Sequence, residues 1–190
     1  MLKSLMLVGV GGQGTILTSK ILSEGLVRCC YDVKMSEIHG MSQRGGSVNT
    51  QIRFGDKVYS PVISTADADL LVAFEKIEAL RYLCYLKKGG TVLVNDYEIY
   101  PPSVLTGIDR YPEGVIEKLK SSVENSVLID AARIAERLGN VRTQNMVILG
   151  AIVKTLGVQK LDWSHIIKEF LPKRLHEINI MAFNAGLESI

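Results

Sequence analysis

Residues 9–14, with the sequence Gly-Val-Gly-Gly-Gln-Gly, form the motif of this chain with the clearest chemical meaning. They follow an apolar run at residues 5–8 and precede a helical pattern that begins near Thr15. Glycines let a backbone turn tightly, and a helix that starts directly after them adds partial positive charge. We therefore expect either an anion- or phosphate-binding turn or a sheet edge that closes against a partner. The residues of this predicted turn are Gly9, Gly11, Gly12, Gln13 and Gly14.

The glycine spacing also fits a dinucleotide-binding fingerprint. Gly9, Gly11 and Gly14 have the GxGxxG pattern between a predicted strand and a predicted helix. Such a fold places an acidic residue about 20 positions further on, at the end of the second strand, and Glu37 lies roughly there. Gln13 would then begin the helix with its amide facing a bound group. The other interpretation is that the glycines only permit tight packing between strand and helix.

A second constellation occupies the segment from Glu37 to Gly46, which begins at the carboxyl end of a predicted strand. Open α/β sheets place their sites at such ends. The segment combines an acid, an imidazole, a guanidinium and an amide without any apolar periodicity, so we expect a docking or binding loop rather than core, although a solvated loop has a similar composition. His39 could act as a general base or as a hydrogen-bond partner. The predicted docking residues are Glu37, His39, Ser42, Gln43, Arg44, Gly45 and Gly46.

Two further polar residues, Gln144 and Asn145, begin a strongly apolar helical segment. They either cap that helix or direct polar groups toward the same edge of the sheet.

Composition restricts the class of protein. The chain has 190 residues, which suits one domain spanning residues 1–190, and a net charge of +2, too small to indicate a nucleic-acid partner. The longest apolar stretch, residues 146–153, is much shorter than a membrane span, and the N-terminus has no signal-peptide layout, so we expect a cytoplasmic protein. The three histidines show no metal-ligand spacing, so we expect no metal site.

Apolar periodicity predicts an α/β fold. Residues 2–8 and 31–38 read as strands joined by a helix, a β-α-β unit with parallel strands. Residues 48–54 alternate like a half-covered strand, and residues 55–60 suggest a hairpin return that adds antiparallel pairing. Residues 69–74, 91–95 and 126–129 read as strands, and a helix over residues 77–86 is expected to stop at Gly89-Gly90. From Thr143 onward the pattern is helical.

These segments together resemble the gamma subunit, or gamma domain, of the 2-oxoacid:ferredoxin oxidoreductases, and within that family the small subunit of the indolepyruvate type. The resemblance is carried by residues 9–14, by residues 37–46 (Glu-Ile-His-Gly-Met-Ser-Gln-Arg-Gly-Gly) and by residues 145–151 (Asn-Met-Val-Ile-Leu-Gly-Ala), and it covers nearly the whole chain. It implies a three-layer α/β/α domain with a mixed, mostly parallel sheet and a helical C-terminal section.

The resemblance also implies a complex that oxidatively decarboxylates 2-oxo acids such as pyruvate, indolepyruvate or branched-chain 2-oxo acids to acyl-CoA, with ferredoxin as electron acceptor. Thiamine diphosphate, magnesium and [4Fe-4S] clusters are expected in a large partner subunit, and coenzyme A is a co-substrate of the complex. The three cysteines, Cys29, Cys30 and Cys84, are too few for a four-cysteine cluster. We therefore expect a companion subunit that binds no cofactor alone, is inactive by itself and could form a homodimer when isolated. The resemblance gives no single residue a catalytic role.

Two other functions stay open from the residues alone. The chain could be a free-standing NAD- or FAD-binding oxidoreductase, with Glu37 as the ribose acceptor. It could also be a non-catalytic scaffold whose glycine turn binds only adventitious anions.

Overall fold

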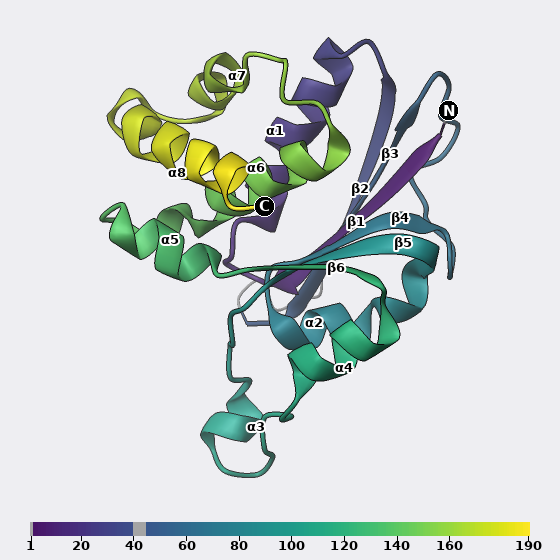
Figure 1. Cartoon of the computed structure of the whole chain (residues 1–190), viewed down its shortest axis with the longest axis vertical. Helices are drawn as coiled ribbons and strands as arrows, with labels where there is room; N and C mark the ends of the chain where they lie inside the picture. Colours follow the sequence, from purple (N-terminus) through teal and green to yellow (C-terminus); the bar gives the residue numbers. More distant parts are fainter. Residues whose placement is uncertain (1, 40–44) are drawn as a thin grey trace.

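The centre of the molecule is a six-stranded sheet with the order β2-β3-β1-β4-β5-β6 (Figure 1). The computed structural model describes residues 2–39 and 45–190, with only the main chain at His39. The strands are β1 (Lys3–Val10), β2 (Asp32–His39), β3 (Ser47–Gly55), β4 (Ala68–Ala73), β5 (Leu86–Asn95) and β6 (Asn125–Ile129). Strands β1, β4, β5 and β6 are parallel, whereas β3 is antiparallel to both of its neighbours, β1 and β2. The predicted mixed, mostly parallel sheet is thus confirmed.

Helices cover both faces of this sheet, as Figure 1 shows. One face carries α1 (Thr15–Arg28), α5 (Ala131–Arg137), α6 (Gln144–Leu156), α7 (Trp163–Phe170) and α8 (His176–Glu188). The other carries α2 (Lys76–Arg81) and α4 (Val115–Ser122), while α3 (Pro102–Leu105) projects beyond them. Short 3₁₀ turns are η1 (Leu83–Tyr85), η2 (Val141–Thr143) and η3 (Lys173–Leu175). Because strand side chains alternate, Leu5 and Leu7 enter the first core and Met6 and Val8 the second. The three-layer prediction is confirmed.

The first β-α-β unit has the predicted parallel strands, with a third strand between them. β2 runs in the same direction as β1, but β3 lies between them and pairs with both. The predicted return strand at residues 58–60 is wrong, because those residues lie outside the strands. Side chains, instead of a partner strand, accept hydrogen bonds from the main chain of this connection. Asp32 Oδ2 accepts from Val58 N–H at 2.9 Å, and Gln51 Oε1 accepts from Ile63 N–H at 2.7 Å. Local alternation identified β3 as a strand but could not identify its partners.

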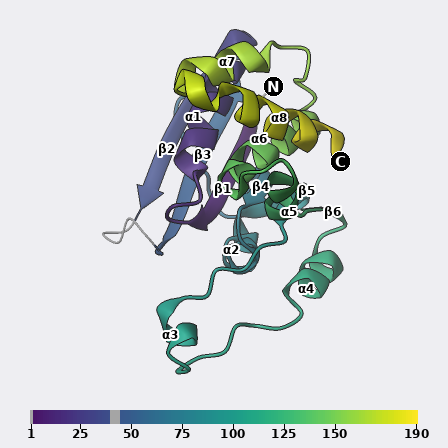
Figure 2. The ribbon, with the colours of Figure 1, turned by 90° about the vertical axis from the view of Figure 1, so that its left-hand side faces the viewer.

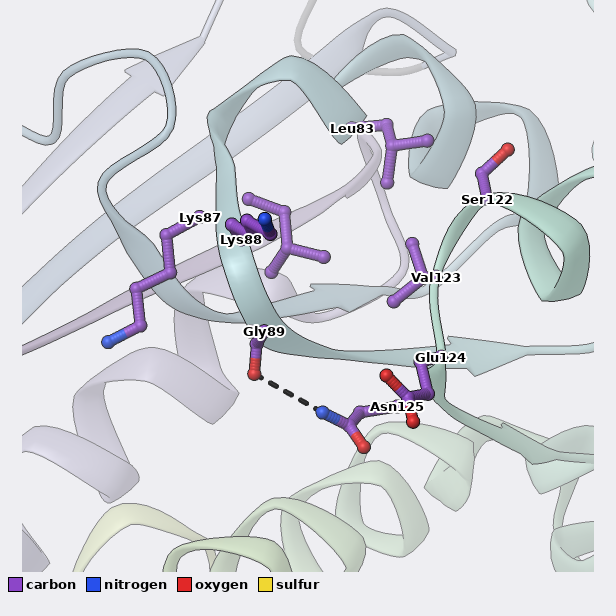
Figure 3. Close-up of a pocket in the computed structure, with 10 residues that line it drawn as sticks. Leu83, Lys87, Lys88, Gly89, Ser122, Val123, Glu124 and Asn125 are labelled. Atoms are coloured by element: carbon purple, nitrogen blue, oxygen red, sulfur yellow. Dashed lines mark hydrogen bonds between the residues drawn. The ribbon is translucent and has the colours of Figure 1, made fainter.

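The prediction around Gly89-Gly90 also needs correction. The helix ends at Arg81, and both glycines belong to β5 instead of stopping a helix. The pairing of β5 with β4 shifts register between Ala68 and Leu70, and Gly89 has a φ of +76°, which glycine adopts at no steric cost. Asn125 Nδ2 donates to the Gly89 carbonyl at 3.2 Å (Figure 3). Long-range pairing therefore makes a strand where local sequence indicated a helix end.

The helical section beyond Thr143 agrees with its prediction. Every residue of α6 from Asn145 to Val153 is buried, and α7 begins with Asp162 accepting from His165 N–H at 3.0 Å. Helices α6 and α8 pack closely against each other. A Cβ added at Gly186 would collide with the main chain of Val147. None of the helices in the described part of the chain is long and apolar enough to cross a membrane.

Candidate functional site

The glycine turn and the end of the predicted docking loop are hydrogen-bonded to each other. Gly11 N–H donates to the Gly46 carbonyl at 2.8 Å, and Gly45 N–H donates to the Gly11 carbonyl at 3.3 Å. In Figure 2 the connection from β1 to α1 lies at the same end of the sheet as the end of β2 and the start of β3. The structure therefore brings the glycine turn and the described ends of the second motif to the same edge of the sheet, at the carboxyl end of β1.

Gln13 is directed into the molecule and is only 8 % exposed. Its Oε1 accepts from Val10 N–H at 2.8 Å, and its Nε2 donates to the Phe74 carbonyl at 2.8 Å. The expectation that this amide faces a bound group is wrong, because both ends of the amide are occupied within the fold. Gln13 instead fixes the turn against the end of β4.

Gly14 lies directly against Asn145 of α6. Its φ is +81°, and a Cβ at this position would approach Asn145 Nδ2 to 2.6 Å. Thr18 Oγ1 donates to the Gly14 carbonyl at 3.1 Å and contacts the Asn145 carbonyl at 3.4 Å. Next to it, Gln144 Oε1 lies 3.4 Å from Asn95 Nδ2. Gln144 and Asn145 therefore direct polar groups toward the same edge of the sheet, one of the two alternatives that the sequence left open.

A cavity of about 530 Å³ opens beside the turn. It is lined by Gly11, Gly12, Gly14, Thr15, Ile16, Leu17, Lys20 and Val48. The N-terminus of α1 contributes to it, and no side chain caps this helix and no acidic residue lies in its first turn. Free N–H groups, the helix dipole and Lys20 together give this cavity an environment suited to an anionic group.

Glu37 lies two strands away from the glycine turn. It pairs with Thr50 of β3, which in turn pairs with Leu7 of β1. Two strand spacings, about 10 Å, separate β2 from β1, so the adjacent arrangement that a ribose acceptor needs is missing. Within the described residues, Glu37 Oε1 is buried and has no hydrogen-bond partner. A buried acceptor of this kind is costly unless a donor reaches it.

The remaining predicted loop residues are only partly described. His39 ends β2 and pairs through its main chain with Val48. Ser42, Gln43 and Arg44 lie outside the described residues, so their contacts stay predictions.

Sequence reasoning missed three buried polar residues at this edge. Glu75 and Glu78 are 1 % and 4 % exposed, and Asn95 is fully buried. Glu75 lies two positions after the end of β4 and accepts from Tyr111 O–H at 2.5 Å, from Ile99 N–H at 3.3 Å and from Glu78 N–H at 3.1 Å. Asn95 donates to the Phe74 carbonyl at 3.1 Å. Their positions after buried strands were the available signal, because that is where α/β sheets gather functional polar groups.

Charges around this edge are strongly paired. Burial and the hydrogen bond to Glu75 raise the pKa of Tyr111 well above its usual value. Burial by itself would lower the pKa of Lys76, but hydrogen bonds to Glu98 and Asp96 outweigh burial and raise it. The hydrogen bond from Lys76 in turn lowers the pKa of Glu98. The tyrosine therefore stays a donor and the Lys76 and Glu98 side chains stay charged near neutral pH.

A second hollow lies at the opposite edge of the sheet, where β5 and β6 begin (Figure 3). It has a volume of about 450 Å³, and its charged residues are Lys87, Lys88 and Glu124. Neither predicted motif contributes to it. In the part of the chain that the structure describes, no group of three or more His, Cys, Asp or Glu side chains is arranged to hold a metal ion.

Known proteins are similar to this chain over nearly its whole length. Residues 4–189 match the family model described as pyruvate ferredoxin/flavodoxin oxidoreductase. The indolepyruvate oxidoreductase subunit IorB of Pyrococcus horikoshii is 38% identical, covering 98% of this chain and 95% of that protein. The 2-oxoglutarate synthase subunit KorC of Methanothermobacter marburgensis is 32% identical over 100% of this chain and 97% of its own.

A solved structure shows the same similarity. The gamma subunit of a keto/oxoacid ferredoxin oxidoreductase from Geobacter sulfurreducens superimposes with a TM-score of 0.74 at 25% identity. The match covers 100% of this chain and 96% of that one.

Proposed function

The chain belongs to the pyruvate ferredoxin/flavodoxin oxidoreductase family as a subunit of a 2-oxoacid:ferredoxin oxidoreductase complex, and we propose that it is the subunit without a cofactor of its own. Residues 1–190 act as one gamma-type domain in this proposal. Cys29 is half-buried and Cys30 and Cys84 are exposed, and three thiols do not complete a four-cysteine cluster. The clusters, thiamine diphosphate and magnesium then belong to a large partner subunit.

The complex in this proposal oxidatively decarboxylates a 2-oxo acid, transfers the acyl group to coenzyme A and passes the electrons to ferredoxin. Thiamine diphosphate supplies the carbanion chemistry when it is bound in the partner. Nothing in the role of this chain requires a catalytic residue of its own. Its role is to complete the assembly and to present a defined surface to the partner.

Indolepyruvate, an aryl pyruvate, is the substrate that we propose. The support is the identity of 38% to a subunit named for indolepyruvate, against 32% to a subunit named for 2-oxoglutarate. Because the reacting cofactor is placed in the partner, the partner's pocket selects the side chain of the 2-oxo acid.

The observation that carries the docking role is the junction between Gly11 and the Gly45-Gly46 end of the loop. It joins the glycine turn to the Gly45-Gly46 end of the loop. We name residues 9–14 and 37–46 the docking surface, in which residues 40–44 are included as a prediction. The turn is then mainly a structural and interface element. Glu37 offers a buried acceptor without a partner in the described chain, and we expect a donor from the complex to complete it. Arg44 stays the predicted anchor, because its planar fork suits a carboxylate or phosphate.

Coexpression with a cluster-bearing large subunit from the same genome tests the proposal. We expect a stable complex that reduces ferredoxin with indolepyruvate only when thiamine diphosphate and coenzyme A are present. Arg44→Ala and Glu37→Gln should weaken assembly, whereas Lys160→Ala, an exposed residue of the helical layer, should not. Tight binding of thiamine diphosphate, NAD or FAD by the isolated chain would contradict the proposal, as would failure of any cluster-bearing subunit to associate.

A further inference from the structure

The segment between β5 and α4, residues 96–114, projects away from both helical layers. We name it the arm. Figures 1 and 2 show α3 at its tip, clear of the other helices in both views. Two aliphatic side chains at this tip, Leu105 and Ile108, are 71% and 79% exposed. They lie three positions apart in the chain, and exposed aliphatic groups that cluster are typical of surfaces that a partner covers.

One buried carboxylate bridges the two stems of the arm. Glu75 Oε1 accepts from Ile99 N–H near the start of the arm and from Tyr111 O–H near its end. The rings of Tyr100 and Tyr111 meet edge to face with centroids 5.3 Å apart. A single side chain of the sheet edge therefore closes both stems of the arm, so the tip has a set orientation although it is exposed.

Glu78, in the first turn of helix α2, holds the end of the docking surface. Glu78 Oε2 accepts from Ser47 Oγ, and Ser47 is the residue directly after the loop. Glu78 Oε1 pairs with Arg81 Nε at 3.0 Å, and Glu78 N–H donates to Glu75 Oε2 at 3.1 Å. The Glu75 carboxylate thus accepts from the main chain of Glu78. Glu75 holds the arm, and Glu78 holds Ser47 at the end of the docking loop.

The arm and the docking surface also share a groove. Val10, Gly45 and Ser47 line it from within or next to the docking surface, Ile99 and Pro101 line it from the arm, and Glu75 and Glu78 also contribute. The groove has a volume of about 80 Å³. Residues of the arm and of the docking surface therefore line the same hollow.

We propose that the arm is a second docking element for the large subunit, with Leu105 and Ile108 entering an apolar recess on that subunit and Glu75 acting as the latch that positions them. This proposal rests on the proposed function, which supplies the partner. The arm and the docking surface line the same groove, so one partner covers both. A latched arm loses little conformational freedom on binding, which strengthens association.

Exposed side chains allow a direct test that does not disturb folding. The double variant Leu105→Ser/Ile108→Ser should bind the purified large subunit roughly tenfold more weakly, with an unchanged melting temperature. The matched control is Tyr59→Ser/Val62→Ser, which removes two exposed apolar side chains, 90% and 60% exposed, from the connection between β3 and β4 at the opposite edge. The control should bind like the unmodified chain. Equal affinity of the arm variant and the control would overturn the proposal.

The latch has its own test. In Glu75→Gln and in Tyr111→Phe, amide hydrogen exchange over residues 97–111 should quicken while exchange in β1 and α6 stays unchanged, and affinity for the large subunit should fall severalfold. Tyr111→Phe removes one hydrogen bond only, so it keeps the test valid if Glu75→Gln folds poorly. Ser47→Ala is the control that leaves exchange in the arm unchanged. Unchanged exchange in Tyr111→Phe would overturn the role of the latch.

The outcomes separate this inference from the proposed function. If the unmodified chain binds no large subunit, the proposed function fails. If it binds and only Arg44→Ala and Glu37→Gln weaken binding, the proposed function stands and the arm proposal fails. If the arm variant abolishes self-association in sedimentation experiments but leaves the affinity for the large subunit intact, the arm joins copies of this chain and the proposal is overturned.

Discussion

Gln13 donates from its side-chain amide to the main-chain carbonyl of Phe74, 2.8 Å away and 61 positions along the chain. The same amide accepts from Val10 N–H, so one side chain joins the end of β1 to the end of β4. The glycine turn is therefore built around an internal polar strut, and its outward face is left to the main chain.

We expect Gln13→Leu to lower the free energy of unfolding by about 1–3 kcal/mol. Phe74 keeps a donor in Asn95, but Val10 N–H would be left buried without an acceptor. Urea unfolding of the isolated chain measures the change. Lys20→Ala, an exposed substitution on the same helix, is the control and should leave the midpoint in place. An unchanged midpoint for Gln13→Leu would show that the strut adds nothing.

Gly14→Ala should destabilise the chain more than Gly12→Ala. Both glycines have positive φ, at +81° and +106°, so both substitutions carry a backbone cost of roughly 1–2 kcal/mol. Only at Gly14 would the new methyl group collide with Asn145, since nothing lies within 4 Å at Gly12. The difference between the two unfolding free energies measures the contact with α6. Asn145→Ala in the Gly14→Ala background should recover part of the loss, and equal losses at both glycines would contradict this packing.

Gly186→Ala should destabilise the helical layer although alanine is the better helix former. Propensity alone would favour alanine by about 1 kcal/mol. The methyl group would collide with the main chain of Val147 on α6, and overpacking of this kind costs about 1–3 kcal/mol or more. Thermal unfolding followed by circular dichroism shows whether the substitution raises or lowers the melting temperature. Asn184→Ala, at an exposed position of α8, is the matched control, and a higher melting temperature for Gly186→Ala would mean that the helices are further apart than described.

Tyr111 should stay protonated at about pH 10, where tyrosines usually ionise. Burial and the Glu75 carboxylate raise its pKa in the folded chain. Because the pKa of Tyr111 is raised in the folded chain, its contribution to the free energy of unfolding is fully present below the ordinary pKa of tyrosine. That contribution is lost only as pH rises through the pKa of the folded chain. Spectrophotometric titration of the seven tyrosines measures this. The unmodified chain and Tyr111→Phe should give equal phenolate absorbance up to unfolding, and a smaller amplitude for Tyr111→Phe near pH 10 would contradict the latch geometry.

The carboxyl edge of the sheet was partly predictable from the sequence. Gly9 to Gly14, the loop from Glu37 and the polar pair Gln144 and Asn145 all follow or precede apolar segments, and such positions gather at one edge of an α/β sheet. Glu75 follows a buried strand in the same way, but with Lys76 and Glu78 beside it the segment reads as an ordinary charged helix start, so nothing local marked it. Its partners Ile99 and Tyr111 are 24 and 36 positions away, which no spacing rule connects.

The sequence by itself determined most of the order of strands and helices, the cap at Asp162 and the family, because periodicity, caps and motifs are properties of neighbouring residues. The tertiary structure decided that β3 lies between β1 and β2, that Gly89 belongs to a bulged strand and that Gln13 turns inward. Each of these depends on which distant backbone groups remain to be hydrogen-bonded once the whole sheet has formed. Local pattern specifies what a segment can become, whereas the pairing of the complete chain selects its neighbours.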